Sequence, residues 1–110
     1  MSNSIDATLP DAVAVDFAVT GTANTKPVPG GTSGQTWVEI TVKGCDVRIS
    51  CGDSTVVAQK AADAAQTVAW QNVFFPTGVV KLHRRFGTYF SVIADDGTST
   101  GFVQIVPVEG

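Results

Sequence analysis

Apolar and polar residues alternate one for one in several separate stretches of this chain. The apolar positions of the first two such stretches, 13–20 and 36–44, are Val13, Val15, Phe17, Val19, Val38, Ile40 and Val42. Successive side chains of a β-strand point to opposite faces, so a period of two gives each strand one apolar face. A helix needs apolar residues three and four positions apart, so the pattern predicts strands with one buried face.

Further stretches of this kind are separated by glycine, proline and aspartate, which favour turns. They cover residues 45–51, 54–58, 67–75, 79–86, 88–95 and 100–108. Asp96-Gly97-Thr98-Ser99 lies between the last two and predicts a hairpin there. Seven or eight short strands with frequent turns are typical of an all-β fold. We therefore expect one antiparallel β-sandwich or small barrel.

The composition agrees with a single β domain spanning residues 1–110. Leucine, a good helix former, occurs only at Leu9 and Leu82, whereas valine, isoleucine and threonine are abundant. We interpret residues 1–11 as an N-terminal arm, because they are polar and show little pattern. Residues 21–35 contain four glycines and two prolines and are expected to form a long loop or arm. Residues 59–66 favour at most one helical turn.

Charge and hydropathy argue against two classes of partner. The net charge is −3, whereas nucleic-acid binding normally requires a basic face. No apolar run approaches the roughly 20 residues that cross a bilayer. The first residues lack the basic and apolar segments of a signal peptide. We therefore expect synthesis in a reducing cytoplasm and no nucleic-acid or membrane partner.

Two cysteines six positions apart, Cys45 and Cys51, invite a disulfide or metal hypothesis. On one strand they would lie about 20 Å apart, far beyond the roughly 7 Å that a disulfide allows between Cα atoms. A metal site needs further ligands, and His83 is the single histidine. We expect two buried thiols that act as small hydrophobic side chains, and no metal or cofactor.

Gly52-Asp53-Ser54 resembles the nucleophile block of an esterase family. A nucleophilic serine needs a histidine base oriented by a carboxylate, but His83 lies among Lys81, Arg84 and Arg85. Strands are expected on both sides of Ser54, so we interpret this stretch as a turn capped by Asp53 or Ser54. The Asp95-Asp96-Gly97 stretch lacks the later acidic ligands of a calcium loop. We expect no catalytic residues and no enzyme activity.

Some aromatic and basic residues are not needed to form the core or the turns of a β-sandwich, so they are candidates for binding a partner. Adjacent Phe74 and Phe75 would point to opposite faces of a strand, which leaves one of them outside the core. Exposed aromatic residues beside arginine are typical of interface hot spots. The basic segment has an alternative interpretation as a charged edge strand that resists aggregation. The candidate partner-binding residues are Trp70, Phe74, Phe75, Lys81, His83, Arg84 and Arg85.

The blocks WVEITVKGCDVRISCGDSTVVA and YFSVIADDGTSTGFVQIVPV, with small residues and an aromatic strand between them, resemble small structural proteins of tailed bacteriophages. The resemblance covers residues 36–108 and transfers no functional residue. It implies a non-enzymatic head decoration or cement protein that binds major capsid subunits in the virion. It also implies a homo-oligomer, for which we expect a trimer.

Two rival functions remain open. One is a carbohydrate- or receptor-binding β-sandwich module of a phage tail fibre or spike, in which Trp37, Trp70 or Tyr89 would stack on sugar rings. The other is a small hydrolase that uses Ser54. Glycan binding would favour the first rival, and an esterase activity lost in Ser54→Ala would favour the second.

Overall fold

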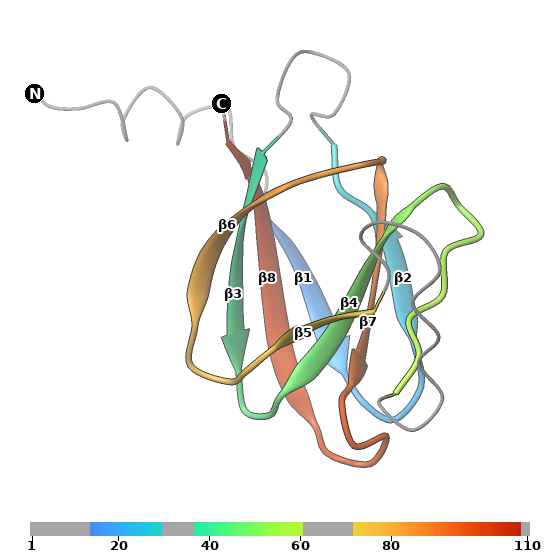
Figure 1. Cartoon of the computed structure of the whole chain (residues 1–110), viewed down its shortest axis with the longest axis vertical. Helices are drawn as coiled ribbons and strands as arrows, with labels where there is room; N and C mark the ends of the chain where they lie inside the picture. Colours follow the sequence, from blue (N-terminus) through green and yellow to red (C-terminus); the bar gives the residue numbers. More distant parts are fainter. Residues whose placement is uncertain (1–13, 30–36, 61–71, 109–110) are drawn as a thin grey trace, which may run out of the picture.

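Eight strands form, most of them within the stretches that the sequence pattern predicts to be strands. The computed structural model describes residues 14–29, 37–60 and 72–108, and these contain no helix. The strands are β1 (Val15–Val19), β2 (Asn24–Pro27), β3 (Trp37–Lys43), β4 (Val47–Gly52), β5 (Val73–Phe75), β6 (Val80–Arg84), β7 (Tyr89–Ala94) and β8 (Gly101–Val108) (Figure 1). The expected all-β class is confirmed.

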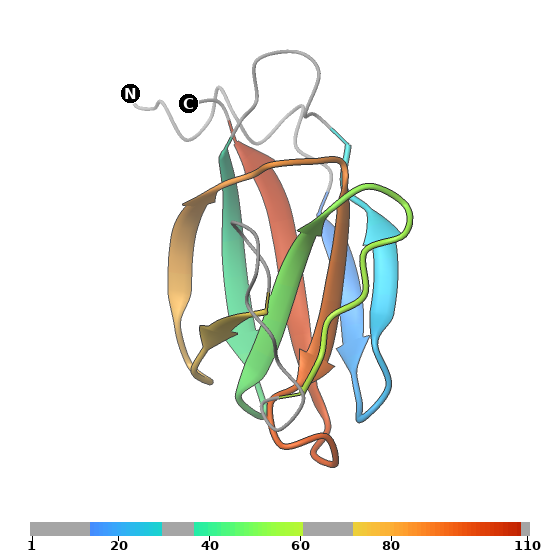
Figure 2. The same ribbon diagram turned by 45° about the vertical axis from the view of Figure 1, so that its right-hand side comes forward.

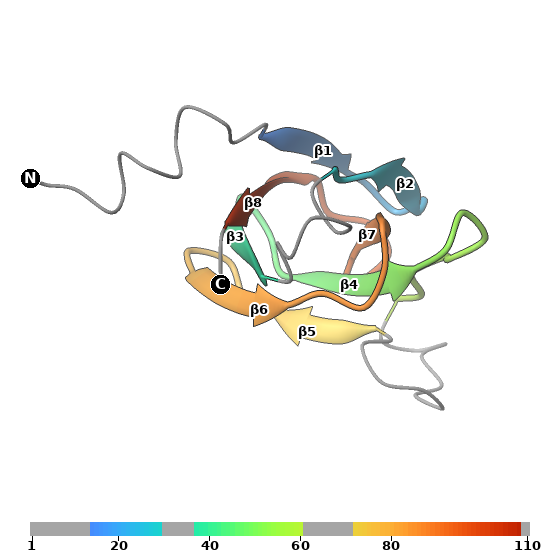
Figure 3. The ribbon, with the colours of Figure 1, turned by 90° about the horizontal axis from the view of Figure 1, so that it is seen from above.

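The strands form two antiparallel sheets of four. Sheet A has the order β1-β8-β3-β6 and sheet B the order β2-β7-β4-β5. The first strand pairs with the last, the second with the seventh, the third with the sixth and the fourth with the fifth. Figures 2 and 3 show the two sheets facing each other. This nested pairing in a double sheet is the jelly-roll arrangement.

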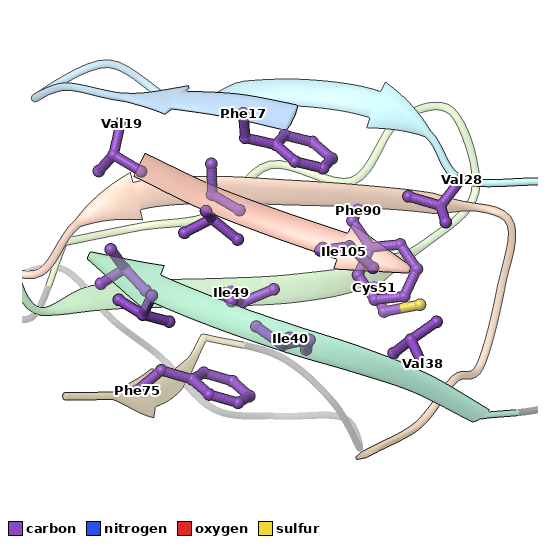
Figure 4. Packing of buried hydrophobic residues seen from close by; sticks show 14 of the residues in the cluster. Phe17, Val19, Val28, Val38, Ile40, Ile49, Cys51, Phe75, Phe90 and Ile105 are labelled. Carbon is purple, nitrogen blue, oxygen red and sulfur yellow. The ribbon is translucent and has the colours of Figure 1, made fainter. Parts of the chain in front are cut away.

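The core lies between the sheets and consists mainly of apolar residues of β1, β3, β4, β5, β7 and β8 (Figure 4). Phe17 from β1, Phe75 from β5 and Phe90 from β7 are its largest members, and all three are fully buried. The strands supply their valines and isoleucines in the expected alternation. Both cysteines are buried and free, as expected. Burial raises the pKa of both thiols, because a thiolate loses its hydration there.

Strand β2 lies within the stretch expected to be a loop. Asn24–Pro27 pairs along one side only, with β7, and forms an edge of sheet B. An edge strand of four residues needs no row of large apolar side chains, and its terminal Pro27 is tolerated at an edge. The prediction of a continuous loop over 21–35 is therefore wrong for residues 24–27.

The expected strand over residues 54–58 is absent. Residues 53–60 instead form an irregular strap across the outer face of sheet B (Figure 2). The Ala58 amide donates to Ser91 Oγ at 2.8 Å, and the Gln59 amide donates to Asn72 Oδ1 at 2.6 Å. Ser50 is on the outer face of sheet B but is completely buried, because the strap and Asn72, whose amide donates to Ser50 Oγ, cover it.

The hairpin expected around residues 96–99 does not form, because the strands on either side of the turn, β7 and β8, do not pair with each other. β7 belongs to sheet B and β8 to sheet A, so the turn crosses between the sheets. The turn chemistry itself is present: Asp96 Oδ1 accepts from the amides of Thr98 at 2.9 Å and Ser99 at 2.8 Å. Gly97 has a φ of 75°, which glycine adopts readily. Hydrogen bonds from Ser99 and Thr98 lower the pKa of Asp96.

Candidate functional site: the β5–β6 edge and the open face of sheet A

The structure gathers most of the predicted partner-binding residues at one edge of the sandwich. β5 is an edge strand of sheet B, β6 is an edge strand of sheet A, and the two lie side by side (Figure 3). The ring of Phe75 meets the ring of His83 there, with centroids 4.9 Å apart and an angle of 65°. Trp70 lies outside the described residues.

Phe74 and Phe75 separate as the alternation predicts. Phe75 is fully buried, whereas Phe74 is 41% exposed on the outer side of β5. The guanidinium of Arg48 lies 5.3 Å from the centre of the Phe74 ring, and its Nε contacts Asp95 Oδ1 at 2.6 Å. The arginine beside the exposed phenylalanine is therefore Arg48 of β4, which we did not predict.

Lys81 and His83, both on β6, differ in exposure. Lys81 is exposed, whereas His83 is partly buried against Phe75. Burial lowers the pKa of His83, because the charged imidazolium would lose hydration, and the positive charge of Lys81 lowers it further. The imidazole therefore favours its neutral form and acts mainly as an edge-on packing group beside the core.

Arg85 is an internal anchor rather than a surface residue. Only 6% of it is exposed, and its guanidinium lies 5.4 Å from the centre of the Phe90 ring. It donates to the carbonyl oxygens of Pro29 at 2.9 Å, Gly87 at 3.0 Å and Val28. These bonds tie the β6–β7 loop to the end of β2. We therefore leave Arg85 out of the candidate binding surface.

The outer face of sheet A carries apolar residues that sequence reasoning did not assign to a surface. Val80 and Leu82 of β6 are 59% and 60% exposed, and Phe102 of β8 is 36% exposed. The register places Leu82 opposite Glu39, and Glu39 in turn opposite Val106. Because every second residue of a strand shares one face, these side chains lie on the same outer face of sheet A, with polar residues such as Glu39 between them.

The next row adds an aromatic residue and a cation to this face. Arg84 of β6 lies opposite Trp37 of β3, and Trp37 lies opposite Val108 of β8. We define the open face as Val80, Leu82, Arg84, Trp37, Glu39, Phe102, Val106 and Val108. The outer face of sheet B differs, because the strap covers part of it. Alternation in the sequence shows which residues share one face of a strand, but it does not show which sheet has an outer face that no other segment covers.

The polar clusters do not assemble a metal site in the part of the chain that the structure describes. No group of three or more His, Cys, Asp or Glu residues there is placed to hold a metal ion. Asp53 Oδ1 accepts from the amide of Thr55 at 2.9 Å, so Gly52-Asp53-Ser54 leads into a capped turn as expected. Within the same residues, no helix is long and apolar enough to span a membrane.

Comparison with known proteins identifies no family. No family model matches the chain, and no curated protein matches it. One solved structure with some similarity is a chain from Bacillus endospore appendages, described as a novel family of disulfide-linked pili. It shares 17% identity, with a TM-score of 0.45 over 91% of this chain and 87% of that chain. This likeness is too distant for a conclusion, so the functional proposal depends on the fold and surface described above.

Proposed function

We propose that this protein is a non-enzymatic structural subunit of a bacteriophage virion that decorates or cements the head by binding major capsid subunits. The observation that carries the proposal is the open face of sheet A on a small jelly roll. Jelly rolls recur in viral capsid domains, which gives an analogy at the level of fold. The open face provides the surface through which such a subunit would act.

The residue types of the open face fit a protein partner. Exposed Val80 and Leu82 lie in water, and covering them would contribute about 25 cal/mol for each Å² of apolar area removed from it. Trp37 beside Arg84 is a residue pair enriched at interface hot spots. Exposed Lys81 and Arg84 at one margin favour a partner with carboxylates facing that edge.

Co-sedimentation with phage heads tests this proposal. The heads are purified from the phage that encodes the chain and lack this subunit. The intact protein is expected to bind them saturably, and Leu82→Asp is expected to weaken binding at least about tenfold, which corresponds to about 1.4 kcal/mol. Val57→Asp is the matched control, because Val57 is 59% exposed on the strap rather than on the open face.

Each outcome of this experiment decides the proposal. Saturable binding that is lost in Leu82→Asp and kept in Val57→Asp supports attachment through the open face. Absence of binding by the intact protein overturns the decoration proposal. Equal binding by the intact protein and Leu82→Asp overturns the assignment of the surface.

A further inference from the structure

A hollow opens at the end of the sandwich where β4 ends and β7 begins. It is a shallow, largely open depression with a volume of about 610 Å³. It is lined by residues of the turn after β4 and of the β6–β7 loop, chiefly Gly52, Asp53, Ser54, Phe86, Gly87 and Tyr89. None of these residues belongs to the open face of sheet A.

Two glycines allow the two segments that form the hollow to meet. A Cβ atom on Gly87 would collide with the carbonyl oxygen of Gly52, so no other residue fits there without a shift of the backbone. The carbonyl oxygen of Gly87 accepts from Arg85 Nε at 3.0 Å and lies 3.6 Å from Cys51 Sγ. The buried anchor Arg85 thus fixes the loop that carries Phe86.

Two aromatic rings contribute to the lining. Phe86 is 58% exposed, so most of its side chain contributes nothing to the core. Tyr89 is the first residue of β7, lies opposite Gly52 in the sheet and is partly buried. The exposed ring of Phe86 offers an apolar face at the hollow on which another molecule can pack.

Polar groups complete the lining. Hydrogen bonds from the hydroxyl and amide of Thr55 lower the pKa of Asp53, so its carboxylate stays ionised at neutral pH. The Ser54 side chain is exposed beside it and offers a hydroxyl. Among the described residues that line this hollow there is no lysine, arginine or histidine, and the nearby guanidinium of Arg85 is buried and bonded to the carbonyl oxygens of Gly87 and Thr88. An ionised carboxylate without a neighbouring cation in the lining disfavours an anionic ligand.

We infer that this hollow binds a neutral sugar in its pyranose form. The C–H face of a pyranose is apolar and packs against an aromatic ring such as Phe86 or Tyr89. Its hydroxyl groups donate to a carboxylate such as Asp53 and exchange hydrogen bonds with a hydroxyl such as Ser54. This site lies apart from the open face, so the inference does not depend on the decoration proposal.

A glycan array followed by NMR titration tests the inference. The full-length protein is screened on immobilised neutral glycans and then titrated with D-glucose, D-galactose and N-acetyl-D-glucosamine. Binding is expected to shift the amide signals of Gly87, Thr88 and Tyr89. Phe86→Ala is expected to weaken binding at least about tenfold, whereas Phe86→Trp, which keeps an aromatic surface, should retain it.

The control variant is Phe102→Ala, which removes an exposed phenylalanine from sheet A. Unchanged amide spectra away from the hollow show that each variant is folded. Glycan binding that Phe86→Ala loses and Phe102→Ala keeps supports the sugar site. No response to any neutral glycan, or equal binding by the intact protein and Phe86→Ala, overturns it.

Discussion

At the scale of single residues, His83 gives this protein a defined pH dependence. The pKa of His83 is lower in the folded protein than the ordinary 6.5, mainly because of burial. The unfolded chain therefore binds more protons between the two pKa values. Stability is then fully present above about pH 6.5 and falls as the pH drops through the folded pKa.

Urea unfolding at about pH 7.5 and about pH 5.5 measures this effect. The free energy of unfolding is expected to be lower at the acid pH. His83→Gln, which carries no charge at either pH, should show a smaller difference. The comparison is clean because His83 is the single histidine, and ordinary carboxyl groups titrate near pH 4. The same pH difference in both proteins would contradict the assignment to His83.

Residue roles were only partly predictable from the sequence. Alternation predicted that one of Phe74 and Phe75 lies outside the core, and this residue is Phe74. The prediction of Phe75 as a partner-binding residue is wrong, because its side chain is fully buried. Alternation did not show that Arg85 is buried. A cation can be buried where carbonyl oxygens accept its hydrogen bonds, and here the acceptors Val28 and Pro29 come from a segment distant in the sequence. Arg48 was missed as the neighbour of Phe74 for a similar reason. Cross-strand neighbours depend on strand order, which local patterns do not encode.

At the scale of elements, the strap depends on one buried hydroxyl. Ser91 Oγ accepts from the Ala58 amide at 2.8 Å, and the Thr25 hydroxyl lies 2.9 Å from it. Ser91→Ala is expected to lower the free energy of unfolding by about 1–3 kcal/mol, because the buried Ala58 amide loses its partner. Urea titration measures the loss, and faster hydrogen exchange at Ala58 would locate it in the strap.

Ser54→Ala is the control for this prediction. Ser54 is exposed, and its substitution should change stability by no more than about 0.5 kcal/mol. If Ser91→Ala were as stable as the control, the bond between Ser91 and Ala58 would not hold the strap.

Strand existence was easier to predict than strand pairing. β3 and β4 alternate along their length, and β7 and β8 are apolar runs bounded by turn residues, so their sequences suffice. β2 and the strap carry no such pattern, because an edge strand and an irregular covering segment are fixed by side-chain hydrogen bonds to distant residues. The turn at residues 96–99 shows the same limit. Its residues specify a change of direction but not the sheet that the next strand joins.

At the scale of the whole molecule, the two sheets are covered unequally. The strap and its hydrogen bonds bury Ser50 and Ser91 on the outer side of sheet B. Sheet A instead exposes Val80 and Leu82 of its edge strand β6. Exposed charges on that strand, Lys81 and Arg84, oppose uncontrolled edge-to-edge pairing of strands. Association through the open face is therefore the favoured way to cover the exposed apolar side chains of sheet A.

For the protein free of capsid, this asymmetry predicts a closed oligomer that covers the open face with a second copy, and we expect a trimer. Copies arranged around a symmetry axis can each place the open face against a neighbour, which removes Val80 and Leu82 from water. Sedimentation velocity at micromolar concentration is expected to show a discrete oligomer for the intact chain. Leu82→Asp should shift it toward monomer, because an ionised carboxylate would have to be desolvated in the interface. Val57→Asp should leave it unchanged. A monomer at every concentration would show that a partner other than a second copy has to cover the open face.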